Sequence, residues 1–257
     1  MRYDFANILF SGRCNARCPY CIGKQIDPRL NQDNLSLYPP RNLDRFVALI
    51  REHAVRQVVM TGTNTDPQLY RHEGRLLDLL RHELPEGTAF SLHTNGRLAL
   101  RKMDLVNAYD RVAISLPSFD PAVYRRMMGV SGVPDLEAIL SRARVPIKVS
   151  CVVTDDNAGD VPRFLERCRS LGVGRLVLRK LMGERRPWDE LLRWEETDLA
   201  FRGSYRGNSV YGHGRMEVTL WDFGQTESHS LNLFSSGAIS TAYLLTEARA
   251  QAQPCLT

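Results

Sequence analysis

The sequence lacks a long hydrophobic run: among its 257 residues no stretch reaches the roughly 18 consecutive apolar residues of a membrane-spanning helix. The first residues include Arg2 and Asp4 and show no apolar segment of the secretory type. We therefore expect a cytoplasmic protein with no membrane partner. Hydrophobic residues make up 43% and charged residues 25% of the chain, which is typical of globular proteins.

Lysine is scarce, although the chain is basic and has a formal net charge of +5. Only Lys24, Lys102, Lys148 and Lys180 are lysines among 34 basic residues, and the rest are arginines. The arginines are spread over the whole chain among Asp and Glu residues. Nucleic-acid-binding proteins normally gather their basic residues on one face, so this distribution argues against a nucleic-acid partner.

Short apolar runs alternate with longer amphipathic stretches up to about residue 181, a pattern that indicates βα units and a parallel sheet. The predicted strands are Phe5–Ser11, Gln57–Thr61, Ala89–His93, Arg111–Leu116, Ile147–Val152 and Arg175–Lys180. The predicted helices are Arg41–His53, Leu69–Leu84, Leu98–Tyr109 and Val161–Leu171. Six strands are too few for a closed eight-stranded barrel. We therefore predict an α/β fold: a partial, open, six-stranded parallel β/α barrel.

The composition of the sequence changes after Met182, where charged and glycine-rich stretches follow. Two segments in which apolar and polar residues alternate come next, Met216–Phe223 and His229–Phe234. We expect two parts, a barrel over residues 1–182 and a short, strand-containing C-terminal extension over residues 183–257. The extension is expected to cover the mouth of the barrel.

Three of the six cysteines lie close together in the loop that follows the first predicted strand. The spacing is Cys14-x3-Cys18-x2-Cys21, at the end of a strand where β/α folds place their chemistry. Thiolates are the soft ligands of iron–sulfur clusters and zinc. Structural zinc takes four ligands, and the nearest histidine, His53, lies far downstream. Three ligands without a fourth nearby suit a metal site that keeps one position open, with zinc or a redox role as alternatives.

This loop resembles that of the radical S-adenosylmethionine (SAM) superfamily, including the aromatic Tyr20 just before the last cysteine. The resemblance implies that Cys14, Cys18 and Cys21 hold a [4Fe–4S] cluster whose fourth iron is chelated by SAM. One electron, from a donor such as flavodoxin or ferredoxin, then releases methionine and a 5′-deoxyadenosyl radical.

The resemblance runs from residue 5 to about residue 182. In addition to Tyr20, it implies further residues that contact SAM. Gly62, Thr63 and Asn64 stand where the family has a Gly-Gly-Glu-Pro type of turn, although this chain lacks the Gly-Gly pair and its acid is Asp66.

The third, fourth and sixth strands supply the other contacts that the resemblance implies. Asn95 belongs to a Thr-Asn-Gly run after the third strand, and Ser115 to an Ile-Ser-Leu run in the fourth. Arg179 ends the sixth strand, where related enzymes place a basic residue near the SAM carboxylate.

Strand alternation gives a test that is independent of the family, because side chains point to opposite faces in turn. If Asn95, Ser115, Ser150 and Arg179 face the interior, the same face carries Ser91, His93, Ala113, Lys148 and Val177. The opposite face is almost wholly apolar and should pack on helices. A structural barrel is filled by branched aliphatic residues, so a polar interior indicates a cavity for SAM and a polar substrate.

Four residues are candidates for catalysis or substrate contact. His93 and Lys148 face the predicted interior, and a buried lysine is costly without an anionic partner. Tyr211 and His213 lie in a glycine-rich stretch that is either a lid over the barrel or a hairpin turn.

We therefore predict an enzyme that cleaves SAM and abstracts a hydrogen atom from a small polar metabolite in cofactor or natural-product biosynthesis. Alternatives are an activating enzyme that places a glycyl radical on a partner protein, and a non-enzymatic zinc-binding module. Cys151 and Cys168 are interpreted as core residues and Cys255 has no evident role, so we expect one cluster only.

Overall fold

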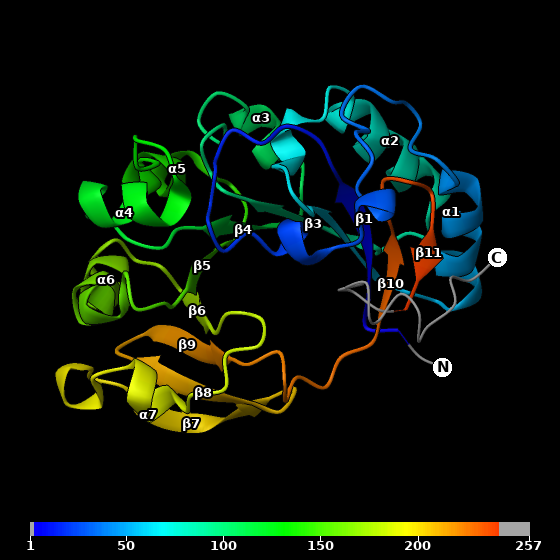
Figure 1. Cartoon of the computed structure of the whole chain (residues 1–257). Helices are drawn as coiled ribbons and strands as arrows, with labels where there is room; N and C mark the ends of the chain where they lie inside the picture. The colour runs from blue at the N-terminus through cyan, green and yellow to red at the C-terminus, as the bar shows by residue number, and fades with distance from the viewer. Residues whose placement is uncertain (1–2, 242–257) are drawn as a thin grey trace.

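The computed structural model describes residues 3–241 and has an open, curved sheet with helices on its outer side (Figure 1). Six parallel strands form its centre. They are β1 (Phe5–Phe10), β2 (Gln57–Gly62), β3 (Ala89–Thr94), β4 (Arg111–Ser115), β5 (Ile147–Val152) and β6 (Arg175–Arg179). Each begins at the predicted residue and ends within one residue of the predicted end. The predicted α/β class is confirmed.

Helices cover the convex face of the sheet (Figure 1). They are α1 (Leu43–Glu52), α2 (Glu73–Glu83), α3 (Met103–Val106), α4 (Pro121–Met128), α5 (Leu136–Arg142) and α6 (Val161–Ser170), and α7 (Trp188–Leu191) follows β6. In α1 the buried residues Phe46, Val47 and Ile50 recur at helical spacing and explain why this segment is a helix packed on the sheet. Two short helices, α4 and α5, lie in a stretch for which no helix was predicted.

Two predicted helices are shorter than expected, each for a local reason. Asp66 and Pro67 begin a separate 3₁₀ turn, η3 (Pro67–Leu69), so α2 starts only at Glu73. The stretch Leu98–Tyr109 contains a single helical turn, α3, between ordinary turns.

The described part of the extension joins both edges of the central sheet. Its strands are β7 (Ala200–Tyr205), β8 (Asn208–His213), β9 (Met216–Trp221), β10 (Ser230–Leu233) and β11 (Ile239–Ser240). β9 pairs parallel with β6, and β10 pairs parallel with β1, which gives the strand order β11-β10-β1-β2-β3-β4-β5-β6-β9-β8-β7. Met216–Phe223 and His229–Phe234 were predicted as alternating segments, and each contains a strand.

The two faces of the sheet differ as strand alternation predicts. Leu92, Ile114, Val149 and Leu178 point to the convex side and are fully buried in the core under the helices. The concave side carries the polar set, including His93 and others described below. No helix among residues 3–241 is long and apolar enough to span a membrane.

Candidate active site

The cysteine loop, residues 12–21, lies at the carboxyl edge of the sheet directly after β1. Cys14, Cys18 and Cys21 are all partly exposed and free of disulfide bonds. The Cys14 Sγ accepts a hydrogen bond from the Ala16 amide at 3.4 Å, and the Cys21 thiol lies 3.7 Å from the Thr63 carbonyl oxygen. Lys24, just after the loop, donates to the Cys18 carbonyl at 2.9 Å and stabilises the loop backbone there.

The end of α4 supports one side of this loop. The Arg17 amide donates to the Met128 carbonyl at 2.8 Å, while the Met128 Sδ lies 3.6 Å from the Cys18 Sγ and 3.5 Å from the Tyr20 hydroxyl. Gly129 follows with a φ of 65°, the left-handed conformation that ends a helix. Met128 is a contact that the sequence analysis missed, since nothing in its spacing linked α4 to the cysteines.

The turn after β2 supports the other side, and two predicted SAM contacts have a positioning role there. Thr63 donates to the Phe10 carbonyl at 3.1 Å and also bonds Asn31. The Asn64 Oδ1 accepts from the Ser11 hydroxyl at 2.8 Å and from the Gly12 amide at 3.1 Å. The Asn64 side chain therefore holds the start of the cysteine loop, and the Thr63 side chain joins the end of β1 to Asn31 beyond the loop.

Gly62 must be glycine for a steric reason. A Cβ at this position would lie 1.8 Å from the Thr65 carbonyl oxygen. The tight turn leaves the backbone of Gly62 accessible beside the loop.

Asp66 connects this turn to the end of β3. Its buried carboxylate accepts hydrogen bonds from the Thr94 hydroxyl at 2.8 Å, the Asn95 amide at 2.6 Å and the Gln68 amide at 2.9 Å. Burial raises the pKa of Asp66, and these bonds oppose that shift. Asn95 in turn donates from its side chain to the Asn15 Oδ1 at 2.7 Å. The predicted contact Asn95 therefore lies beside the cysteine loop.

The three thiols fit an iron–sulfur cluster better than a single metal ion. Burial raises the pKa of the Cys18 thiol to about 11, and the Cys21 and Cys14 thiols of the same loop add to the shift. Yet no group of three or more His, Cys, Asp or Glu among residues 3–241 is close enough to hold one ion. In a cluster each iron takes its own thiolate, so neighbouring thiols need not converge on a point.

A cavity of about 860 Å³ opens on the concave face. It extends from the strand starts, where Arg111 and Arg175 line it, to the carboxyl edge, where Arg179 and Met182 line it. Of the residues predicted to face the interior, six line the cavity and three do not. The six are Ser91, His93, Ala113, Lys148, Val177 and Arg179, and the three are Asn95, Ser115 and Ser150. In Figure 1 the concave side lies between β10, which pairs with β1, and β9, which pairs with β6.

The predicted SAM contacts Ser115 and Arg179 end strands β4 and β6 on this concave side. Ser115 is exposed at the end of β4, two residues beyond Ala113. The Arg179 guanidinium lies 5.6 Å from the ring centre of Trp221 and 6.0 Å from that of Phe223. These aromatic faces orient the arginine within the cavity.

Burial and neighbouring cations change the acid–base behaviour of two candidates. Burial lowers the pKa of His93 well below its usual range, and Lys148 and Arg179 add to the effect. Burial also lowers the pKa of Lys148 to about 8, with further contributions from Arg179, Arg175 and Arg111. The imidazole is therefore neutral at pH 7, and the lysine lies in cationic surroundings.

The other two candidates for catalysis do not reach the cavity. Tyr211, on β8, packs against the rings of Trp194 and of Phe201 on β7. His213 is buried, with its Nδ1 3.0 Å from the Asp198 carbonyl and its Nε2 3.5 Å from Glu166 on α6. The glycine-rich stretch forms the β7–β8 and β8–β9 hairpins, so its role as a lid is not supported.

Two cationic residues of the cavity were missed from the sequence. Arg111 begins β4 and Arg175 begins β6, each two residues before a position predicted to face the interior. Extending the same alternation by one more step toward the strand starts would have identified both.

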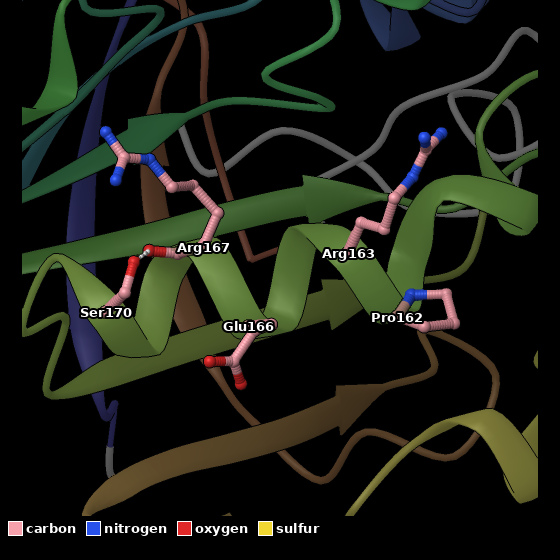
Figure 2. Close-up of a pocket in the computed structure, with 5 residues that line it drawn as sticks. All are labelled: Pro162, Arg163, Glu166, Arg167 and Ser170. Carbon is pink, nitrogen blue, oxygen red and sulfur yellow. Dashed lines mark hydrogen bonds between the residues drawn. The ribbon is translucent and has the colours of Figure 1, made fainter.

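A second, shallow depression lies on the outer surface of α6, lined by Pro162, Arg163, Glu166, Arg167 and Ser170 (Figure 2). Its arginines are engaged in ion pairs with Asp160 at 2.9 Å and Glu137 at 3.0 Å. None of the predicted site residues lines it, so we do not consider it the active site.

The structure has a three-cysteine loop at the carboxyl edge of a parallel sheet and a polar cavity on the concave face of that sheet, and this combination defines an iron–sulfur enzyme of the α/β class. Residues 8–168 match the family model of the radical SAM superfamily, and the chain belongs to that superfamily. It is therefore an enzyme that binds a [4Fe–4S] cluster and SAM. The non-enzymatic zinc module considered above is wrong.

Curated relatives are GTP 3′,8-cyclases. The chain is 28% identical to the enzyme of Rhodopseudomonas palustris over 66% of its own length and 51% of that protein. It is 30% identical to a probable GTP 3′,8-cyclase of Halobacterium salinarum over 69% of its length and 50% of that protein. The chain thus spans about half the length of these relatives.

Solved structures share the fold. The structure of anSMEcpe with bound AdoMet and the Cp18Cys peptide is similar over 93% of this chain and 74% of that one, with a TM-score of 0.58 and 14% identity. Streptococcus suis SuiB bound to its precursor peptide SuiA is similar over 70% of this chain and 40% of that one, with a TM-score of 0.56 and 16% identity.

Proposed function

We propose that this chain abstracts a hydrogen atom from a small polar metabolite held on the concave face of its sheet. The cavity of about 860 Å³ carries the proposal, because small-molecule sites commonly have volumes of roughly 300–1,000 Å³. When bound, the cluster held by Cys14, Cys18 and Cys21 together with SAM would supply the radical chemistry for hydrogen abstraction. The tasks of binding, orienting and shielding the metabolite then belong to the side chains of this protein.

The carboxyl edge is the SAM side of the proposed site. Cys14, Cys18 and Cys21 hold the cluster there, and Asn95 and the backbone of Gly62 lie beside the same loop. Arg179 presents a planar guanidinium at this end of the cavity, which suits a carboxylate such as that of SAM.

The extension is the substrate side of the proposed site. We divide the chain into a barrel, residues 1–182, and an extension, residues 183–257, whose last residues lie outside the described part. Tyr205 and Arg206 at the β7–β8 turn, and Thr226 and Ser228 before β10, line the cavity together with the barrel strands. Side chains from both parts therefore narrow the space, which favours a small molecule over the inserted protein loop that a glycyl-radical activating enzyme needs.

The names of the relatives support a small polar substrate, since GTP is one. GTP therefore belongs among the first metabolites to test, together with a fractionated metabolite pool. We further propose that flavodoxin or ferredoxin supplies the electron.

The test is an anaerobic SAM-cleavage assay with the reconstituted enzyme and a chemical reductant, measuring 5′-deoxyadenosine with and without each metabolite fraction. We expect one fraction to raise 5′-deoxyadenosine above background, and deuterium from the labelled metabolite to appear in it. If fractions raise SAM cleavage but none of them transfers deuterium to the 5′-deoxyadenosine, the proposal of hydrogen abstraction from a small metabolite is wrong.

A further inference from the structure

Lys148 is a cation without a protein partner inside the cavity. Among residues 3–241 its ammonium makes no hydrogen bond or ion pair, and the charged groups that act on it, Arg179, Arg175 and Arg111, are all cations. A charged group removed from water is costly unless it is paired. No group among residues 3–241 supplies the missing anion, so the site is suited to an anionic ligand.

Two carboxylates near the starts of the neighbouring strands are already engaged. Glu217 on β9 pairs with Arg175 at 2.9 Å. Asp110, which lines the same cavity, accepts from the Phe90 amide at 2.6 Å and lies 3.3 Å from Arg81. Neither neutralises Lys148.

The sheet register places a gap next to this ammonium. His93 on β3 is aligned with Ala113 on β4, and Ala113 is aligned with Lys148 on β5. All three side chains line the cavity. Because the middle residue has only a methyl group, the imidazole and the ammonium flank an open space above Ala113.

Ser91 provides a second, independent sign of a ligand in this space. Its side chain is 1% exposed and lines the cavity, yet its hydroxyl has no hydrogen-bond partner. Ser91 lies on β3 two residues before His93, on the same face. A buried hydroxyl without a partner is rare in proteins, so this group also awaits a ligand.

We propose that Ser91, His93 and Lys148 form a subsite for an anionic group of the substrate, a phosphate or a carboxylate. The neutral imidazole offers one N–H, the serine offers its hydroxyl, and the ammonium offers charge-assisted donors. This inference rests on the proposed function. The subsite places the charged end of the metabolite about two residues, or roughly 7 Å, from Ser115 toward the amino ends of the strands. The reacting carbon of the metabolite then lies on the side of the cysteine loop.

The experiment measures binding of two probes, inorganic phosphate and acetate, to the reconstituted holoenzyme with SAM by calorimetry at pH 7 and constant ionic strength. We expect the wild type to bind one of them, and the one that binds identifies the group. Lys148→Met should weaken that binding about tenfold or more, and Lys148→Arg should retain most of it. The control Arg45→Met removes an exposed cation from the outer helix α1 and should bind as the wild type does.

Ala113→Leu is a second variant that leaves every charge in place. Its larger side chain fills the space between His93 and Lys148 and should abolish binding of the same probe. Wild-type binding in either Lys148→Met or Ala113→Leu would overturn the subsite, as would binding of neither probe to the wild type. 5′-Deoxyadenosine formation by the same wild-type preparation separates the two ideas: if it persists while the anion test fails, only the subsite is wrong.

Discussion

Gly129 and Arg17 lie in backbone contact: a Cβ on Gly129 would be 2.5 Å from the Arg17 carbonyl oxygen. The amide of Arg17 is at the same time bound to the carbonyl of Met128, at 2.8 Å. The end of α4 and the middle of the cysteine loop are thus fitted to one another without room for a side chain.

Gly129→Ala should therefore displace the cysteine loop. Gly172→Ala is the matched control, since Gly172 also has a positive φ, of 77°, but would meet nothing within 4 Å. We expect the control to lose about 1–2 kcal/mol of unfolding free energy from backbone strain alone. Gly129→Ala should lose more and should also retain less iron after desalting. Equal iron retention in the two variants would show that the contact with Arg17 does not position the loop.

Cys18→Ala should abolish both cluster binding and SAM cleavage, because each of the three thiolates holds one iron. Cys168→Ala, in the buried face of α6, should keep the cluster and lose only modest stability. The measurements are iron content, visible absorbance and 5′-deoxyadenosine. Retained cleavage in Cys18→Ala would contradict the role of the loop.

We predict a single cluster, and so about four iron ions per chain after anaerobic reconstitution. Cys151 and Cys168 are buried in the apolar core, and Cys255 lies outside the described residues. A further cluster normally takes about four cysteines, and only these three are left. A value near eight irons would refute the prediction.

Lys148→Met should be more stable than the wild type at pH 7 in the absence of binding anions. The pKa of Lys148 is lowered from 10.5 to about 8 in the folded protein. Below pH 8 the lysine is charged in both states and its burial costs stability, on the order of 1–3 kcal/mol. Between about pH 8 and 10.5 only the unfolded chain holds the proton, so the unfolding free energy of the wild type rises with pH there.

The variant lacks this titration, so its advantage should shrink as the pH rises from 8 toward 10.5. Denaturant unfolding of both proteins at pH 7 and at pH 10, in a buffer free of phosphate and carboxylates, measures the difference. An advantage that stays constant over this range would show that burial of the charge is not its cause.

Much of the central fold is predictable from sequence because its signals are local. The buried strands are short apolar runs, and alternation within β3 to β6 assigns His93, Ala113 and Lys148 to one face. The same local rule accounts for the core face, where Leu92, Ile114 and Val149 are buried.

Other features depend on partners that are distant in sequence. Nothing in Ser230–Leu233 shows that this short strand pairs with β1, since pairing is decided by which edge is left open. Tyr211 and His213 look suited to a ligand as residue types, but the β8 pairing turns them toward Trp194 and α6. The roles of Thr63 and Asn64 likewise depend on where the cysteine loop lies.

The pairing of β10 with β1 also separates the order of synthesis from the order of assembly. The Asn7 side chain donates to the Asn232 Oδ1 at 2.6 Å, across 225 positions of the chain. During translation, β1 and the cysteine loop leave the ribosome before β10, and one edge of β1 stays open until residues near 232 emerge. An open strand edge is prone to pair with other chains. The emerging polypeptide must therefore carry its metal-binding loop on an incomplete sheet until β10 has been made, and the strand before that loop gains its second neighbour only then.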